Sequence, residues 1–246
     1  MISFLSTIVP AFIFVIMSII IAYKEELGLE KKILIVCISA LIQLLILGFI
    51  INIIFNLGLF FTFLMIFVMI LIASYMIKNE ININERSIIF LSSCFSLLFT
   101  STISLLILIY SGIVELKPQY IIPLVGMVIG NSMNSITLCL ERLLNDLKSN
   151  KDILWGYLAL GANDYQAMKP FIRNAIKAAL IPQMNRTKTV GLIFIPGAMV
   201  GMLLSGADPI RAAEIQIVIM WMILSGTLLS TLITCYLIYK KFMKYV

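Results

Sequence analysis

The side chains that usually carry enzymatic chemistry are scarce in this sequence. Histidine is absent, so the chain offers no Ser-His-Asp triad, no Cys-His dyad and no imidazole ligand for a metal. The dipeptide Gly-Lys never occurs either, so a Walker A phosphate loop cannot be built. We therefore expect no enzyme here, no cofactor bound by this chain, and ATP, if it is used, on a partner.

The acidic and thiol side chains leave equally little for chemistry inside a membrane. All 12 aspartates and glutamates fall in loops or at the ends of apolar stretches. Proton-coupled carriers usually keep a carboxylate or histidine within a span, so this pattern favours an external energy source or an uncoupled channel. The four widely spaced cysteines are interpreted as small buried hydrophobic side chains: Cys37, Cys94, Cys139 and Cys235.

Neutral oxygen and sulfur donors are what remains for binding a solute. They lie in two apolar stretches of the second half of the chain: Asn131, Ser132, Asn134, Ser135, Met199 and Met202. Asn131 and Asn134 are three residues apart and share a helix face, and an amide in lipid needs a partner. These residues predict either a substrate path or a seam between subunits. Neutral donors hold a divalent cation weakly, which suits its release.

Small residues accompany these donors at a spacing that favours close helix packing. Gly126 and Gly130 form one GxxxG pattern, and Gly197 and Gly201 form a second. Pro196 precedes the second pattern and removes a backbone donor there. We expect these positions to let helix backbones approach one another.

The composition shows what kind of element positions these residues. Hydrophobic residues make up 61% of the 246 residues, and only 12% are charged, against about 25% in soluble domains. The mean hydropathy is +1.09. We therefore predict an all-α integral membrane protein with a single transmembrane domain over residues 1–246. The basic pI reflects residues left on the cytoplasmic side rather than nucleic-acid binding.

Seven apolar stretches are long enough to cross the bilayer, since about 20 helical residues span about 30 Å of hydrocarbon. They cover residues 4–23, 33–55, 59–77, 87–111, 119–140, 189–206 and 215–239. The second and third are separated only by Asn56, Leu57 and Gly58, which we interpret as a turn. The expected fold is therefore seven transmembrane helices.

Lysine and arginine divide unequally between the two sides of this arrangement. Of the 18 basic residues, only Lys117 and Arg211 fall on one side. The other side includes Arg186 and Lys188 in the loop before the sixth span, and Lys244 in the tail. The positive-inside rule then places the N-terminus outside and the C-terminus in the cytoplasm of a cell membrane.

Residues 142–188 form a long polar loop that we expect to be helical and cytoplasmic. A first helix is predicted over residues 152–160 and should end at Gly161. Asn163 and Gln166 form a capping-box pattern at the start of a second helix.

The second helix of the loop should run to about Leu180 and stop at Pro182. It combines an apolar face with a basic stripe at every fourth position: Lys169, Arg173 and Lys177. Such a helix either lies on the anionic inner leaflet or docks a cytoplasmic partner, with residues 159–162 at its exposed turn.

Residues 118–222 carry several short motifs in a fixed order. They are Gly130-Asn131-Ser132-Met133-Asn134, Glu141-Arg142-Leu143, Leu160-Gly161-Ala162, Gln166-Ala167, Ala178-Ala179-Leu180-Ile181-Pro182, Val190-Gly191-Leu192, Pro196-Gly197, Asp208-Pro209 and Gln216-Ile217. In this order they resemble the FetB/YbbM-type permease family of ABC transporters. The chain departs from the family pattern at Trp155, where a glutamate is usual, and over residues 198–202.

That resemblance implies a transport subunit that works as two copies of this chain with two copies of a cytoplasmic ABC ATPase. It implies iron export, and plant relatives are linked to aluminium tolerance and nucleotide-sugar transport. It also implies ATPase coupling through Leu160, Gly161, Ala162 and Gln166, and it adds Gln216 to the substrate path. The alternatives are an uncoupled channel, a membrane scaffold, or an ABC permease for a nucleotide sugar or another small solute.

Overall fold

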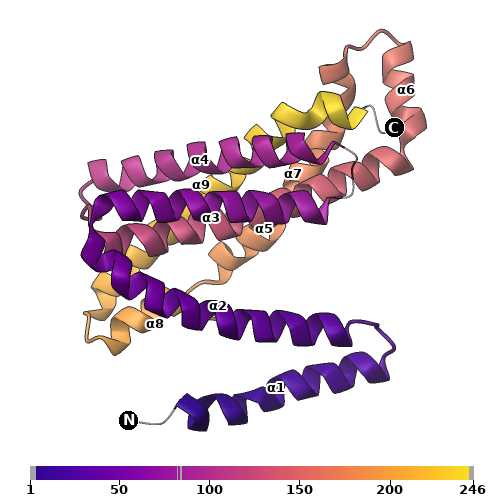
Figure 1. Cartoon of the computed structure of the whole chain (residues 1–246). Helices are drawn as coiled ribbons and strands as arrows, with labels where there is room; N and C mark the ends of the chain where they lie inside the picture. Colours follow the sequence, from indigo (N-terminus) through magenta and orange to yellow (C-terminus); the bar gives the residue numbers. More distant parts are fainter. Residues whose placement is uncertain (1–3, 82, 84, 244–246) are drawn as a thin grey trace. The chain divides into compact units, whose positions relative to one another are not determined.

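The computed structural model describes residues 4–81, 83 and 85–243, and this part of the chain folds into nine helices (Figure 1). Their bounds are α1 Phe4–Lys24, α2 Glu30–Leu57, α3 Leu59–Glu80, α4 Arg86–Tyr110, α5 Pro118–Ser149, α6 Lys151–Ala159, α7 Asp164–Thr189, α8 Gly197–Leu204 and α9 Pro209–Phe242. The chain divides into two compact units, Met1–Leu57 and Gly58–Val246, which are described separately. Lys244 lies outside the described residues.

The first unit is a hairpin of α1 and α2, joined by a short turn in which Glu26 and Gly28 have positive φ. Most described side chains on both helices are exposed and apolar, as expected of helices in lipid. α2 is long and apolar enough to cross a membrane over Glu30–Phe55, whereas the apolar stretch described in α1 is the shorter Ile8–Lys24. The first predicted span therefore stays a prediction.

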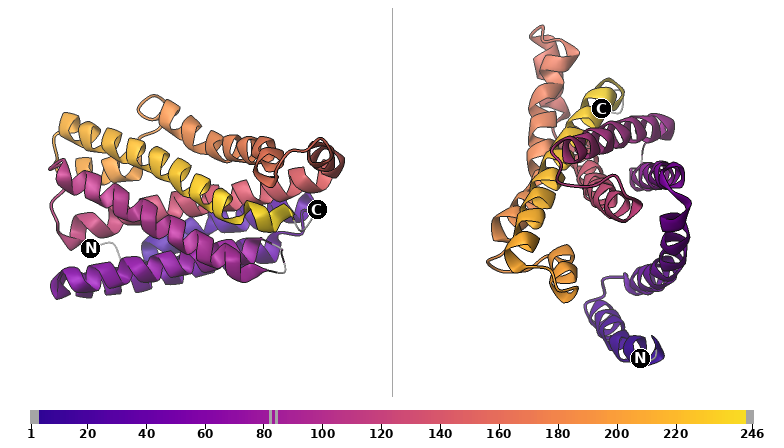
Figure 2. Two further views of the ribbon diagram at one scale, coloured as in Figure 1. Left: turned by 90° about the horizontal axis from the view of Figure 1, so that it is seen from above. Right: turned by 90° about the vertical axis from the view of Figure 1, so that its left-hand side faces the viewer.

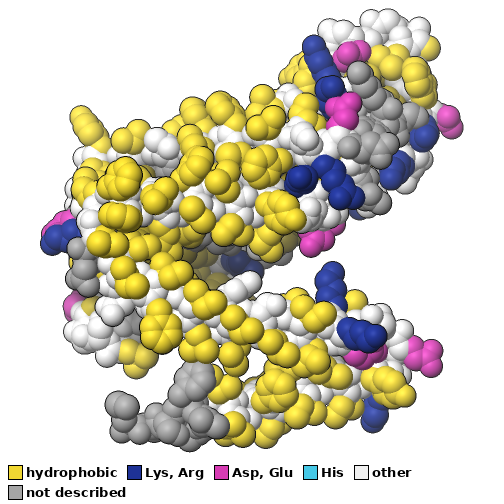
Figure 3. Space-filling view, viewed as in Figure 1, with side chains coloured by type: hydrophobic (Ala, Val, Ile, Leu, Met, Phe, Trp, Pro, Cys, Tyr) yellow, Lys and Arg dark blue, Asp and Glu magenta, His cyan; other side chains and the backbone are white. Residues whose placement is uncertain are grey.

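The second unit is a bundle in which α3, α4, α5 and α9 share one core (Figure 2). These four helices are each long and apolar enough to cross a membrane. The predicted third, fourth, fifth and seventh spans are therefore confirmed as long apolar helices. α2 ends at Leu57 and α3 begins at Leu59, so the predicted break is confirmed at Gly58, where φ is 87°. Hydrophobic side chains cover the flank of the bundle, and charged ones gather toward its ends (Figure 3).

The predicted sixth span is wrong as a continuous helix. α7 ends at Thr189, residues 190–196 form a turn, and α8 contains only 8 residues. Gly191 has φ of 78°, which ends the α-helix there, and Pro196 has no N–H to continue it. A helix of that length covers about 12 Å, too little to cross the hydrocarbon alone.

The second loop helix starts where predicted and continues beyond its predicted end. Asn163 Oδ1 accepts from Gln166 N, and Asn163 N donates to Gln166 Oε1, both at 2.9 Å, so the capping box is confirmed. The expected stop at Pro182 is wrong, because α7 continues through this proline to Thr189. The apolar face of α7 packs against α5 and α9, and this burial offsets the backbone hydrogen bond that proline removes.

The core between α4 and α9 is lined by hydroxyl groups rather than by bulky side chains. Both helices bury serines and threonines at helical spacing: Ser92, Ser93, Ser96, Thr100, Ser101 and Ser104 on α4, and Thr227, Ser230, Thr231 and Thr234 on α9. Ser96 and Thr234 hydroxyl oxygens lie 2.6 Å apart. Cys139 and Cys235 are buried as predicted, with their sulfur atoms 3.3 Å apart between α5 and α9, whereas Cys37 and Cys94 are only partly buried.

The bundle has two ends, which we name the α6 end and the α8 end. The α6 end holds α6, the start of α7, the α3–α4 turn and the end of α9, where Lys241 Nζ lies 3.0 Å from Glu85 Oε2. The α8 end holds α8 and the turns that precede α5 and α9. Lys117 lies there, and a hydrogen bond to Glu115 together with charge attraction from its carboxylate raises the pKa of the Lys117 ammonium.

Candidate functional site

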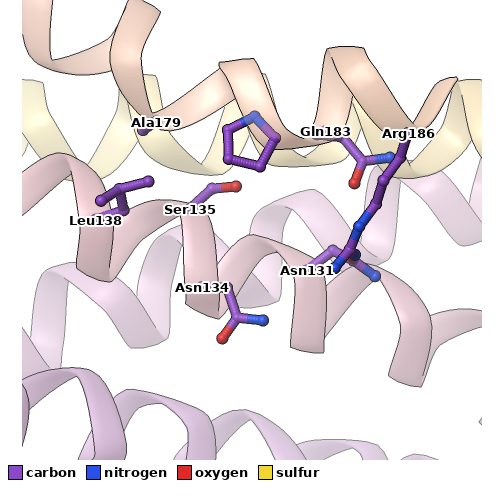
Figure 4. A pocket seen from close by; sticks show the side chains of 8 residues that line it. Asn131, Asn134, Ser135, Leu138, Ala179, Gln183 and Arg186 are labelled. Carbon is purple, nitrogen blue, oxygen red and sulfur yellow. The ribbon is translucent and has the colours of Figure 1, made fainter. Parts of the chain in front are cut away.

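A polar pocket lies between α5 and α7, with a cavity of about 80 Å³ (Figure 4). Its lining residues are Asn131, Asn134, Ser135, Leu138, Ala179, Pro182, Gln183 and Arg186. On each helix these positions repeat at three, four and seven residues, which places them along one face. α5 and α7 are antiparallel, and the two sets of residues have the same spacing. The pocket therefore forms where these two helix faces lie opposite each other.

A hydrogen bond between the two helices orders one end of this pocket. Arg186 Nη1 donates to Asn131 Oδ1 at 3.1 Å, and Asn131 Nδ2 donates to the Met127 carbonyl at 2.8 Å. The Asn131 amide is therefore fixed from both sides. None of the ion pairs found in the described part of the chain involves Arg186.

Two further amides line the pocket without a side-chain partner among the described residues. Gln183 is only 5% exposed, and in Figure 4 its side chain extends from α7 toward Arg186. Asn134 is exposed and lies between this pocket and a second hollow next to Glu80 and Glu141. Both amides can donate and accept hydrogen bonds, so the pocket offers ligand-binding groups that the protomer does not use.

Contacts at the middle of the bundle fix the depth of this pocket. A Cβ atom at Gly226 would lie 3.1 Å from Cγ1 of Val128 and 3.4 Å from Cγ2 of Thr100. Gly226 and Thr100 lie near the midpoints of α9 and α4, so Val128 marks the middle of the bundle. Asn131 follows Val128 by about 4.5 Å along the axis. Arg186 therefore lies about halfway along the bundle and not in an end loop, contrary to the sequence prediction.

The other residues predicted for the substrate path are distributed over different environments. Ser135 lines the α5–α7 pocket, whereas Ser132 is fully buried and does not line it, and the Ser132 hydroxyl has no partner among the described residues. Met202 lines a second cavity, of about 620 Å³, at the α8 end, and Met199 lines neither cavity. Gln216 is 4% exposed, and its Oε1 has no partner in the described chain.

The predicted packing glycines also separate into groups. A Cβ at Gly126 would lie 3.0 Å from Met69 Cε, so this glycine admits a flexible side chain of α3. Gly130, Gly197 and Gly201 have no atom within 4 Å of a Cβ in that position, so they face open space in the protomer. Pro196 is the N-cap of α8. The close helix contact in the core is made by Gly226 instead, which the sequence analysis did not single out.

The residues predicted to couple to an ATPase gather at the α6 end. Gly161 has φ of 88°, which confirms the expected tight turn between α6 and α7. Leu160 beside it is 89% exposed, and Gln166 belongs to the capping box. The next turns of α7 form a shallow basic groove, lined by Gln166, Lys169, Pro170, Arg173, Asn174 and Lys177.

The sequence analysis missed Pro182, Gln183 and Arg186 as pocket residues. The available signal was their spacing: with Ala179 they repeat the pattern of the α5 stripe. The assumption that Pro182 ends the helix concealed this signal. In the part of the chain that the structure describes, no group of three or more His, Cys, Asp or Glu side chains converges as a metal site.

The long apolar helices and the polar pocket between them define a multi-pass α-helical membrane protein. Comparison with known proteins gives the family. The chain belongs to the UPF0014 family, described as an uncharacterised protein family, whose sequence profile matches residues 5–243. This confirms the resemblance to the FetB-type permeases noted from the motifs.

Three relatives illustrate the range of this family. The chain is 38% identical to the "Probable iron export permease protein FetB" of Escherichia coli, over 94% of this chain and 89% of the relative. It is 32% identical to the "UPF0014 membrane protein YjkA" of Bacillus subtilis, over 93% and 91%. It is 30% identical to the "Protein ALUMINUM SENSITIVE 3" of Arabidopsis thaliana, over 94% and 85%. No solved structure matches the chain.

Proposed function

We propose that this protein is the membrane-spanning permease subunit of an ABC transporter that exports an iron-like metal. Two copies of the chain form the pore, and a separate ATPase supplies the energy. The protein lies in the cell membrane with its N-terminus outside and its C-terminus in the cytoplasm. The observation that carries the proposal is the polar, charged pocket halfway along an otherwise apolar bundle.

The depth of Arg186 supports a transport path. A charged side chain within the hydrocarbon region is costly, by about 3 kcal/mol on insertion scales, and such residues face a protein interior or a water-filled cavity. Arg186 and Asn134 are exposed on the protomer. This face therefore needs a cover other than lipid, and a second copy of the chain supplies it. Two facing pockets then line one central route.

The α6 end supports coupling to an ATPase. α6 buries only Leu154 and leaves Ile153, Trp155 and Tyr157 at least 40% exposed. The exposed turn at Gly161 joins these apolar side chains to the basic groove of α7. An apolar helix bordered by cations fits a groove on a cytoplasmic partner. The relative named as an iron export permease supports iron as the exported solute.

Purification of the tagged chain from its own host tests the proposal. An ATPase with a Walker A motif should co-purify in equal numbers with this chain, and the complex should hydrolyse ATP. Iron-loaded proteoliposomes of the complex should then release iron only when ATP is supplied on the ATPase side. Ion release without an ATPase would instead indicate an uncoupled channel, and no transport at all would favour a scaffold.

A substitution at the turn tests where the ATPase docks. Gly161→Trp should leave membrane insertion intact and lower ATPase recruitment about tenfold, which corresponds to about 1.4 kcal/mol of binding free energy. Gly112→Trp is a matched control, because Gly112 also has positive φ and open space but lies at the α8 end. Equal recruitment by both variants would place the docking element elsewhere.

A further inference from the structure

The charge of the α5–α7 pocket is positive. Arg186 is the only charged residue that lines it, and the other polar groups are neutral amides and a hydroxyl. Lys188, two residues further along α7, does not line the pocket. No acidic side chain of the described residues lines this pocket. The carboxylates of Glu80 and Glu141 lie in the neighbouring hollow, which Asn134 also lines.

This charge does not suit a bare metal cation. A guanidinium repels a divalent cation, and the repulsion is stronger in the low dielectric of a membrane protein than in water. The same groups suit oxygen anions. A guanidinium has five N–H donors, of which the structure shows one donated to Asn131, and planar guanidinium forks match carboxylate and phosphate oxygens. The Gln183 and Asn134 amides add N–H donors from both helices.

We propose that this pocket binds the transported solute as a small oxygen anion, so that iron crosses as a negatively charged chelate rather than as a bare cation. The inference rests on the proposed transport function and specifies its substrate class. Gln183 adds a second observation, because its side chain is only 5% exposed, lines the pocket and has no side-chain partner among the described residues. The cavity of about 80 Å³ in one protomer holds only part of a chelate, so the second copy completes the site.

A simpler role for Arg186 is to stabilise the C-terminal end of α7, where basic residues interact favourably with the helix dipole. That role does not require the guanidinium to reach across to α5. The bond to Asn131 directs it into the pocket. Lys188 lies in the same turn and can serve the helix end by itself.

The test compares iron species in proteoliposomes of the assembled complex with its ATPase. Four probes are supplied: ferric citrate, ferrous iron kept reduced, citrate alone and inorganic phosphate. We expect ATP-dependent movement of ferric citrate at least tenfold faster than that of ferrous iron. Arg186→Gln should lower ferric citrate transport about tenfold and leave ferrous iron unchanged or faster. Arg186→Lys should retain part of the activity, and Arg86→Gln, at the start of α4, should change neither rate.

The outcomes separate this inference from the proposed function. If the complex transports ferrous iron faster than ferric citrate, and Arg186→Gln does not lower that ferrous iron rate, the inference is overturned while the proposed transport function still holds. If citrate or phosphate is transported without iron, the anion site is supported, and iron is no longer the proposed substrate. No ATP-dependent movement of any probe overturns the proposed function itself. If Arg186→Gln does not assemble, Gln183→Ala replaces it, because it removes a donor and keeps the charge; an unchanged ferric citrate rate would then count against the site.

Discussion

The two faces of α5 place polar residues in opposite situations. Toward α3, α4 and α9, the helix buries Ile129, Ser132, Ile136 and Cys139 in a closed core. Toward α7, it presents the asparagines that line the pocket. We name the first side the closed face of α5 and the second its open face. Both faces belong to one continuous helix, so the difference comes from what packs against each face.

The comparison shows which polar groups a membrane helix can satisfy alone. A serine or threonine hydroxyl can donate to a carbonyl one turn earlier in its own helix, as Thr231 and Thr234 do. An amide or a guanidinium has more donors and acceptors than one turn can supply. Asn131 donates within α5 and still requires Arg186 of α7 as a donor to its oxygen. An amide therefore depends on another helix or on a ligand, whereas a hydroxyl can be satisfied within its own helix.

The largest effect on the closed face should come from Gly226→Leu. The added side chain would begin 3.1 Å from Val128 and 3.4 Å from Thr100, so α9 must move away from α4 and α5. Overpacking of this kind costs about 1–3 kcal/mol. Thermal unfolding in detergent should show a lower midpoint. Gly130→Leu is the control, because its Cβ would meet no atom within 4 Å; equal damage by both would contradict the closed core.

On the open face, Asn134→Leu should lower transport about tenfold, the equivalent of one hydrogen bond to a charged group. The dimer should survive, as measured by light scattering after size-exclusion chromatography. Ser93→Ala is a control in the closed core, since this buried hydroxyl of α4 has no partner in the described chain. Loss of the dimer, or unchanged transport, would show that Asn134 does not line the path.

A smaller effect is expected where α7 begins. Asn163→Ala removes an N-cap and should cost about 1 kcal/mol. Amide hydrogen exchange should become faster in the first turn of α7 and remain unchanged in α9. Asp208→Ala should do the reverse, because the Asp208 carboxylate accepts from the N–H groups of Ile210 and Arg211 at the start of α9. Equal changes in both helices would mean that the two caps are not independent.

The smallest effect should come from the hydroxyl pair between α4 and α9. A double-mutant cycle of Ser96→Ala and Thr234→Val should give a coupling of about 0.6 kcal/mol, the average for hydrogen bonds between membrane helices. The measurement is unfolding of the four proteins of the cycle in detergent. A coupling above about 2 kcal/mol would mean that hydroxyl pairs, and not only amides, hold this bundle together.

Local features of this protein could be predicted from the sequence because local chemistry determines them. Long apolar stretches require helices, and five of the seven predicted spans coincide with such helices. The break at Gly58, the turn at Gly161 and the capping box at Asn163 each depend on a few neighbouring residues. The asparagines of α5 were identified as unusual for the same reason, since an amide in an apolar stretch needs a partner wherever the helix lies.

The partner of that amide was decided only by the tertiary structure. Arg186 is 55 positions away from Asn131 in the sequence, and it reaches α5 because α7 continues past Pro182. A proline in a helix costs about 3 kcal/mol, which from the sequence alone predicts a helix end. Packing against α5 and α9 offsets that cost, and the break moves to residues 190–196, which interrupt the predicted sixth span. Burial of a whole helix face outweighs one missing hydrogen bond, and only the folded bundle shows which face is buried.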